Sequence, residues 1–417
     1  MSDRPPPRIV CLDLDTFFVS VERLLDPTLL GVPVVVGASG WRGVVTSASY
    51  EVRALGVRSG MSIVEARRLA PDAVYLPTRH GVYGEYAARV KEVLFTGTDM
   101  VQTASIDEFF LDFRGCERVW SRPDDPDDDH TVLRRVWELR DTIQREVGLP
   151  ASAGIASTRP LAKMASREAK PAGVFLVPAG GERAFVADQP VRAFPGIGPV
   201  TEAALTDAGI HTLGALLDLP LTPGRLRQRF AGLAATVRRA ADPERVAALG
   251  RDRPAFHEHD PAGHTIGSIS NERTFHADVG DRGAVDDQLR SLVERVCWRA
   301  RRRGVEARTV TVKLRTSDFH TVSRGHSAPP TAADAALLPR ARALLEAAWT
   351  RALPVRLVGV ALSNLQPAAP QLTLPFGVPR GEAPARPGVS RAIDAVRDRF
   401  GYDAIRLGAV GSTSWIA

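Results

Sequence analysis

The sequence predicts a multidomain chain of the mixed α/β class. Strand-like apolar runs alternate with helical stripes over about the first 180 residues, and short helical segments punctuated by Gly and Pro occupy 190–250. Beyond them, strands and helices are expected in the order βαββαβ between 264 and 365. At 417 residues the chain is long enough for about two to four domains, each with a substantial core.

Acidic residues follow predicted strands at two places in the amino-terminal part. The apolar run 8–12 ends at Asp13, and a pair of strands over 101–113 carries Asp107 and Glu108 near its turn. Carboxylates in apolar strands are costly to desolvate unless they are paired or bind a cation. Oxygen ligands with no Cys or His cluster nearby favour Mg²⁺ or Mn²⁺ over zinc. Spacing alone leaves a metal site and structural ion pairs equally open.

The segment 44–53 is predicted to run from a strand into a helix, whose first N–H groups could face an anion. We expect Ser47, Tyr50 and Arg53 to lie on one turn and to offer hydroxyl groups and a guanidinium to phosphate oxygens. An ordinary Ser-capped helix with an exposed Arg explains the same pattern.

Helices and strands continue to alternate up to residue 169. Helices are predicted over 81–96, 131–147 and 160–169, and a strand over 151–156, which is compatible with an α/β layer. The Asp-rich run 124–129 is expected to be a solvated surface loop. It lacks the alternating ligands and the Gly of a calcium loop.

Gly196 and Gly198 flank Ile197 in a turn that precedes a predicted helix. This pattern resembles a helix-hairpin-helix, in which a nucleic-acid backbone can approach freed N–H groups. A Gly-rich turn between core helices is the alternative. The polar, Pro-containing stretch that follows, 251–262, is predicted to be a linker.

The carboxy-terminal strands are expected to form a sheet with one open face. Helices over 282–303 and 331–353 would cover the other face, while Arg273, Lys313 and Arg315 lie on the strands. A phosphate-binding surface is the functional interpretation, and exposed basic residues without a ligand are the alternative. The predicted strands are 264–276, 308–317, 320–325 and 354–365.

Composition narrows the class of protein. Lys plus Arg number 54 against 48 for Asp plus Glu, which gives a net charge of +6 and weakly favours a polyanionic partner. Cys11, Cys116 and Cys297 have neither metal-ligand spacing nor an even pairing, and no apolar leader or 18-residue apolar run occurs. We therefore expect a protein of the reducing cytoplasm that does not enter a membrane.

Lysine is rare in this chain. Only Lys91, Lys163, Lys170 and Lys313 occur beside a large number of arginines. A lysine that persists against such a bias can mark a need for a compact ammonium group, and Lys170 is the strongest candidate. Chance retention is an equal explanation for the other three.

From residue 367 the composition shifts to Pro, Ala and Gly. The apolar residues of 371–376 lie within this stretch, where such anchors often mark a docking peptide. An amphipathic segment over 390–400 follows.

Taken together, these segments resemble the Y-family translesion DNA polymerases, most closely the bacterial polymerase IV branch. The match extends from about residue 8 to about residue 365, in order and at family-like spacing. It includes both acidic motifs, Tyr50 and Arg53 after their strand, Ala169-Lys170-Pro171 and the Gly-rich hairpin. Coincidence is improbable for so many concordant segments.

The resemblance implies a role for each matching residue. Two Mg²⁺ ions, for which Mn²⁺ could substitute, would be held by the catalytic carboxylates Asp13, Asp107 and Glu108 and by the Leu14 carbonyl. Asp15 would support local structure. The triphosphate would contact Tyr50, Arg53 and Lys170, with Ser47 as a lesser candidate, and Phe18 would be the steric gate against a 2′-hydroxyl while Phe17 packs in the core.

The resemblance also implies a right-hand polymerase fold and its reaction. The enzyme would transfer dNMP from a dNTP to a primer 3′-hydroxyl on template DNA, with low fidelity and without proofreading. Gly196, Gly198, Lys313 and Arg315 would contact DNA. The expected parts are the palm (1–18 and 83–180), fingers (19–82), helical thumb (181–250), linker (251–262), βαββαβ little finger (263–366) and a tail (367–417).

The tail contains a six-residue pattern, Gln-Leu-x-Leu-x-Phe, that resembles the bacterial sliding-clamp peptide. Its anchors are Gln371, Leu372, Leu374 and Phe376. A short hydrophobic patch in a linker is the alternative. A monomer in the bacterial cytoplasm is expected.

Two rival classes share some of these features. A catalytically dead polymerase-like scaffold would explain the DNA-binding modules, but such proteins typically lose the acidic triad. A palm-type nucleotide cyclase would explain the acids and the phosphate contacts, but not the hairpin or the basic carboxy-terminal module.

Overall fold

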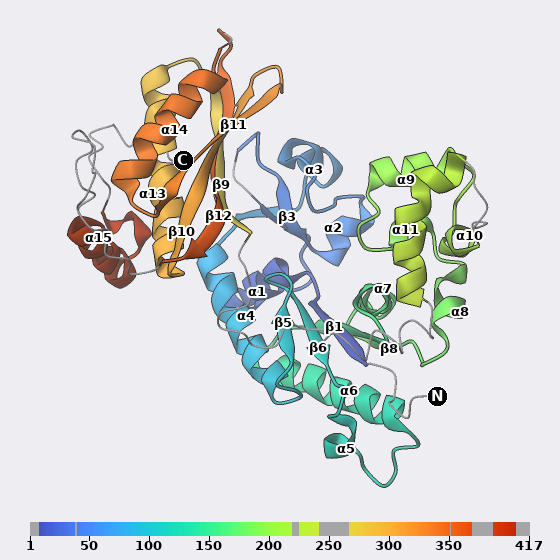
Figure 1. Ribbon diagram of the computed structural model, residues 1–417. Helices are drawn as coiled ribbons and strands as arrows, with labels where there is room; N and C mark the ends of the chain where they lie inside the picture. Colours follow the sequence, from blue (N-terminus) through green and yellow to red (C-terminus); the bar gives the residue numbers. More distant parts are fainter. Residues whose placement is uncertain are drawn as a thin grey trace. The chain divides into compact units, whose positions relative to one another are not determined.

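The computed structural model describes residues 8–37, 40–218, 225–241, 267–350, 352–368 and 387–405. The chain divides into two compact units, Met1–Pro261 and Ala262–Ala417 (Figure 1). Among the described helices, none is long and apolar enough to cross a membrane.

A five-stranded sheet in the order β5-β6-β1-β7-β8 forms the centre of the first unit. The middle strand, β1 (Ile9–Leu14), pairs antiparallel with β6 (Glu108–Asp112) and with β7 (Ala151–Ala156). The outer strands are β5 (Val101–Thr103) and β8 (Val174–Leu176). The two strands predicted over 101–113 and the strand predicted over 151–156 are thereby confirmed.

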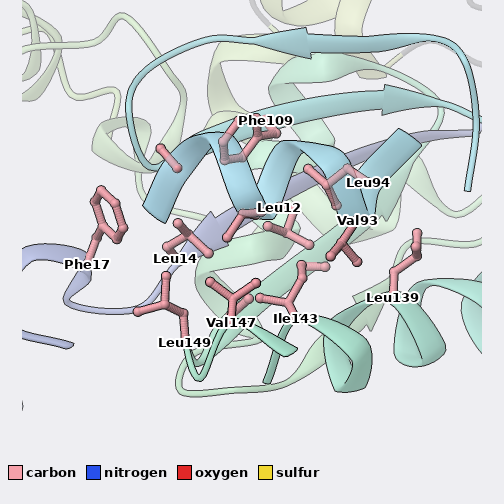
Figure 2. Close-up of a cluster of buried hydrophobic side chains, with 14 of the residues drawn as sticks. Leu12, Leu14, Phe17, Val93, Leu94, Phe109, Leu139, Ile143, Val147 and Leu149 are labelled. Atoms are coloured by element: carbon pink, nitrogen blue, oxygen red, sulfur yellow. The ribbon is translucent and has the colours of Figure 1, made fainter. Parts of the chain in front are cut away.

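Alternate residues of β1 enter two different cores, as the period of two in a strand requires. Leu12 and Leu14 pack with Phe109 and with residues of α4 (His80–Phe95) and α6 (Asp128–Glu146), as Figure 2 shows. On the opposite face lie Ile9, Cys11 and Phe110 with Leu161 of α7 (Arg159–Glu168). The predicted helices over 81–96, 131–147 and 160–169 are confirmed within a few residues. Both faces of β1 are therefore covered along most of its length.

Helix α7 approaches the sheet very closely at Gly154. A Cβ on Gly154 would lie 2.1 Å from the backbone nitrogen of Ser166 and 2.2 Å from the carbonyl oxygen of Ala162. No other residue fits this contact, which fixes the height of α7 above β7.

A three-stranded sheet, β3-β2-β4, follows α1 (Phe17–Leu25) and the short η1 (Pro27–Leu29). Val35, Val45, Val52 and Ile63 contribute to its own small core. Its strands are β2 (Val34–Gly37), β3 (Val45–Ala48) and β4 (Val74–Pro77), and its helices are α2 (Tyr50–Ala54) and α3 (Ile63–Leu69).

A group of helices follows β8 in the described part of the first unit. Leu205, Leu213, Leu216 and Val237 bury their side chains together with residues of α7. The elements are α8 (Glu182–Ala187), η2 (Val191–Ala193), α9 (Pro199–Thr206), α10 (Leu213–Leu217) and α11 (Arg225–Ala241).

The Asp-rich run differs from the expected solvated loop. Asp127 caps α6 by accepting a hydrogen bond from the His130 backbone N–H at 2.9 Å, and Asp125 accepts one from Arg134 Nε at 2.9 Å. Asp129 accepts another from Arg8 Nε at 2.6 Å. The run, which lies just after α5 (Glu117–Trp120), therefore anchors the start of α6 through caps and ion pairs.

The second unit has the predicted βαββαβ order. Its sheet runs β11-β10-β12-β9, and Val310, Val312 and Leu314 of β10 alternate into a core shared with two helices. The elements are β9 (Ser268–Val279), α13 (Arg282–Arg302), β10 (Val305–Thr316), β11 (Thr321–Thr331), α14 (Asp334–Ala348) and β12 (Val355–Pro367).

The carboxy-terminal helix α15 (Pro387–Phe400), followed by η3 (Tyr402–Ala404), packs on α13 of the same unit. Arg397 is 2% exposed, and its guanidinium donates to Glu294 Oε2 at 2.6 Å. Arg301 Nε donates to Asp394 Oδ2 at 2.6 Å, and the Trp298 and Tyr402 ring centroids lie 5.1 Å apart. The predicted amphipathic segment is thus a docked part of this unit.

Candidate active site

The acidic residues converge at one end of β1 because of strand register. Asp13 and Glu108 are directly opposite each other in the β1–β6 pairing, and the Leu14 N–H donates to the Asp107 carbonyl at 2.9 Å. Side-chain exposure is 23% for Asp13 and 11% for Glu108, and Asp107 is half-buried. The structure therefore places Asp13 beside Asp107 and Glu108, two adjacent residues that lie more than ninety positions later in the sequence.

Two lysines face these carboxylates. The Lys170 ammonium pairs with Asp13 Oδ1, and the Lys163 ammonium of α7 pairs with Glu108 Oε2. The Asp107 carboxylate accepts a hydrogen bond from the Ser105 hydroxyl. The sequence indicated Lys170 but not Lys163, whose only signal was its persistence among arginines.

Electrostatics at this edge favour added positive charge. Burial raises the pKa of Asp13, an effect that Lys170 opposes and that the charges of Asp107 and Glu108 reinforce. Within the described ranges the acids do not gather into a ready cluster of three metal ligands, because two of them turn toward lysines. Partly buried, mutually repelling oxygen donors nevertheless fit a divalent cation, since it would supply the charge that the lysines now provide.

Asp15 lies 3.8 Å from the Lys170 ammonium through its Oδ1, but its other contacts are structural. Its carboxylate is 1% exposed and accepts hydrogen bonds at Oδ2 from the Ser152 hydroxyl at 2.8 Å and from the Ala172 N–H at 2.7 Å. These bonds hold the segment after Lys170 against the sheet. Asp15 therefore supports the loop that carries Lys170.

Tyr50 and Arg53 lie one turn apart on α2. The Arg53 Nε donates to the Ala48 carbonyl at 2.9 Å, and its guanidinium carbon lies 5.5 Å from the Tyr50 ring centroid. Burial, followed by the charge of Asp15, raises the pKa of Tyr50, so its hydroxyl stays protonated at neutral pH. Ser47 lies buried in β3 and not on the helical turn, because the strand continues to Ala48.

Phe18 is 7% exposed and stacks on the ring of Tyr83. Their centroids lie 4.1 Å apart with 15° between the ring planes. Phe17 is buried in the core beside Leu14 and Leu149, as expected (Figure 2). No local pattern indicated Tyr83 as a neighbour of Phe18, since it lies in a helix about sixty-five residues away.

The residues expected to contact DNA lie on two other surfaces. Gly196 adopts φ +95° and Gly198 is the residue before α9, so a turn with a glycine-dependent backbone does precede a helix. In the second unit, Lys313 pairs with Glu272 at 2.7 Å and Arg315 Nε donates to the Thr321 hydroxyl at 2.8 Å. Gln371, Leu372, Leu374 and Phe376 lie outside the described residues.

The sequence matches known proteins over most of its length. Residues 12–167 match the impB/mucB/samB family, and residues 267–374 match the impB/mucB/samB family C-terminal domain. DNA polymerase IV of Halorhodospira halophila (strain DSM 244 / SL1) is 38% identical over 365 residues, which cover 86% of this chain and 96% of that protein. DNA polymerase IV of Caulobacter vibrioides (strain ATCC 19089 / CIP 103742 / CB 15) is 36% identical over 403 residues, covering 96% and 93%.

Solved structures share the fold at lower identity. A Y-family DNA polymerase chimera (Dbh-Dpo4(243-245)-Dbh) superposes with a TM-score of 0.72 at 23% identity, covering 86% of this chain and 98% of its own. DinB from Sulfolobus solfataricus gives a TM-score of 0.55 at 23% identity, covering 85% and 98%.

The fold is that of a right-hand polymerase, with palm, small fingers, helical thumb and little finger. The chain belongs to the impB/mucB/samB family of Y-family polymerases, in the branch of the DNA polymerases IV. Its fold implies a divalent metal cofactor.

Proposed function

We propose that this protein is a DNA-directed DNA polymerase that carries out error-prone translesion synthesis by adding dNMP to a primer 3′-hydroxyl and releasing pyrophosphate. The register of Asp13 opposite Glu108, with Asp107 beside them, is the observation that carries the proposal. It places three carboxylates at the edge of a sheet in a fold shared with Y-family polymerases.

Asp13, Asp107 and Glu108 would hold Mg²⁺, with the Leu14 carbonyl as a further oxygen ligand and Mn²⁺ as a substitute. When bound, two such ions lower the pKa of the attacking hydroxyl and neutralise charge on the phosphates. Asp15 keeps Lys170 in place through its bonds to Ser152 and Ala172.

Lys170, Tyr50 and Arg53 are the proposed contacts of the β and γ phosphates. One ammonium, one guanidinium and a protonated hydroxyl would neutralise and hydrogen-bond the leaving pyrophosphate. Ser47 is a weaker candidate, because its position in β3 buries it. Phe18 would lie beside the sugar and exclude a 2′-hydroxyl by contact.

The proposed parts follow the boundaries expected from the sequence: palm 1–18 and 83–180, fingers 19–82, thumb 181–250, little finger 263–366. Gly196, Gly198, Lys313 and Arg315 would contact primer–template DNA. Since Lys313 and Arg315 now contact Glu272 and Thr321, phosphates would replace those partners. A small fingers module leaves much of the nascent base pair uncontacted, which fits low fidelity.

The peptide 371–376 is proposed to bind the sliding clamp of a bacterial replisome, with the chain itself a monomer. Immobilised clamp should retain the wild-type chain but not the variant that combines Leu374→Ala with Phe376→Ala. If the clamp retains the wild-type chain and the double variant equally, the peptide 371–376 is not the clamp-binding segment.

Primer extension by the purified chain tests the catalytic proposal. Asp107→Asn should lose extension by about 10²- to 10³-fold while it still binds primer–template DNA, because phosphate contacts elsewhere supply the affinity. Asp141→Asn is the matched control, since that carboxylate is 63% exposed and pairs with the adjacent Arg140 on the surface of α6. Primer extension by Asp107→Asn at the wild-type rate would refute the assigned site. Cyclisation of a nucleotide in place of primer extension would show that the protein is not a polymerase.

A further inference from the structure

The ring of Phe18 is held within a cluster of aromatic side chains. Tyr83 lies flat against it, and the His80 ring meets it edge-on at 6.0 Å and 85°. Tyr83 is fully buried and also lies 6.3 Å from the Phe17 ring. The Phe18 ring therefore cannot move toward Tyr83 unless Tyr83 moves as well.

The Tyr83 hydroxyl fixes the position of its ring. It donates a hydrogen bond of 2.6 Å to Glu22 Oε1, and Glu22 is 3% exposed. Burial, together with this bond to Glu22, raises the pKa of Tyr83 to about 12, so the hydroxyl remains a donor throughout the neutral range.

Arg79 completes the network. Its Nε donates to the same Glu22 oxygen at 2.9 Å, and its second nitrogen pairs with Glu22 Oε2. Glu22 lies on α1, four residues after Phe18, whereas Arg79 and Tyr83 lie at the start of α4. A single buried carboxylate thus joins the helix that carries Phe18 to the helix that carries its stacking partner.

We propose that Glu22 and Tyr83 are positioning residues for Phe18 and thereby set the selectivity of the enzyme for deoxyribose over ribose. The proposal rests on the proposed polymerase function and on Phe18 as the residue that meets the sugar. A gate that works by steric exclusion discriminates only as far as its ring resists displacement. Tyr83 backs the ring, and Glu22 prevents Tyr83 from moving.

Two conservative variants test this role. Tyr83→Phe keeps the stacked ring but removes the hydroxyl, and Glu22→Gln keeps the shape but removes the charge that binds Arg79. The matched control is Tyr75→Phe, which removes a hydroxyl that donates to the Ala70 carbonyl at 3.1 Å within the fingers. Primer extension is measured as kcat/KM for a dNTP and for the corresponding rNTP.

The ratio of the two kcat/KM values is the decisive readout. Tyr83→Phe and Glu22→Gln should lower the preference for dNTP by about 3- to 10-fold, mainly because rNTP is used better. Tyr75→Phe should keep the wild-type ratio. A purely structural effect would reduce both kcat/KM values together, and an unchanged ratio in both variants would overturn the proposal.

Phe18→Ala separates this proposal from the function on which it rests. If wild type extends primers and Phe18→Ala relaxes sugar choice while Tyr83→Phe and Glu22→Gln do not, only the positioning role is wrong. If Phe18→Ala leaves sugar choice unchanged, Phe18 is not the steric gate, and the positioning role of Glu22 and Tyr83 is wrong as well. Absence of extension by wild type would contradict the proposed function itself.

Discussion

The Lys163 ammonium and the Glu108 carboxylate form an ion pair between α7 and β6. Glu108 is nearly buried and lies opposite Asp13, so this pair offsets repulsion between carboxylates at the edge of the sheet. Lys163 therefore acts as an internal counter-charge for the acidic site.

Lys163→Met should lower the stability of the metal-free protein by about 1 kcal/mol, since it leaves Glu108 without its cationic partner. Added Mg²⁺ should restore part of this loss, because a bound cation would replace the missing charge. Thermal denaturation with and without MgCl₂ measures both effects. Lys91→Met, which removes an ammonium that lies over the Phe95 ring on α4, is the control and should show no dependence of its stability change on Mg²⁺.

Asp13→Asn should lower activity by about 10²- to 10³-fold and yet stabilise the metal-free protein at neutral pH. The pKa of Asp13 is raised in the folded state above its ordinary value of 3.8. The native protein then binds more protons than the unfolded chain just above that value, so wild-type stability falls as pH rises through this window.

The stability difference between Asp13→Asn and wild type should therefore vanish below about pH 3.8, where Asp13 is protonated in both states, and grow as pH rises above it. Urea denaturation of the two proteins at several pH values in EDTA measures the difference. If Asp13→Asn is less stable than wild type at neutral pH, the ion pair with Lys170 stabilises the Asp13 carboxylate by more than its burial costs, which would contradict this prediction.

Charge removal on the open face of the little-finger sheet should weaken DNA binding in a salt-dependent way. Lys313→Ala and Arg315→Ala should each reduce the slope of log K against log salt by about 0.9, because each releases one counterion fewer. Fluorescence anisotropy with labelled primer–template at several salt concentrations gives the slope. The control is Arg282→Ala on α13. The Arg282 side chain is 63% exposed, and its removal should leave the salt slope unchanged.

Loss of the buried pair under α15 should destabilise the second unit strongly. Arg397→Met removes the guanidinium that donates to the buried Glu294 carboxylate, and breaking a buried ion pair in this way costs about 3–5 kcal/mol. Urea denaturation followed by tryptophan fluorescence is suitable, since Trp298 contacts Tyr402 beside this pair. Arg399→Met on the exposed side of α15 should change stability by less than about 0.5 kcal/mol.

Much of the fold could be predicted from local pattern. The alternation of Leu12 and Leu14 with Cys11 marked a strand buried on both faces, and the stripe that includes Leu139 and Ile143 marked α6. These signals are repeated every two or every three to four residues, so they survive in a single sequence. Ser47 was misplaced because the boundary between a strand and a helix depends on pairing partners, here Val36 of β2.

Long-range electrostatic partners could not be predicted in the same way. The pairing of Glu108 with Lys163 depends on how closely α7 approaches the sheet, which the contact at Gly154 determines. The contact of Glu22 with Tyr83 depends on the crossing of α1 and α4. Likewise, the amphipathic pattern of 390–400 indicated a helix with an apolar side but not that Arg397 would be buried against Glu294.

Template-directed extension of a primer by the purified full chain tests the central claim most directly. Each of the four templating bases is paired with each single dNTP, with and without Mg²⁺, and DNA binding is measured in the same samples. We expect Mg²⁺-dependent addition of mainly the complementary nucleotide, frequent misinsertion and no removal of a mismatched primer end. A folded, DNA-bound chain that adds no nucleotide, or that adds nucleotides without regard to the template, would contradict the account.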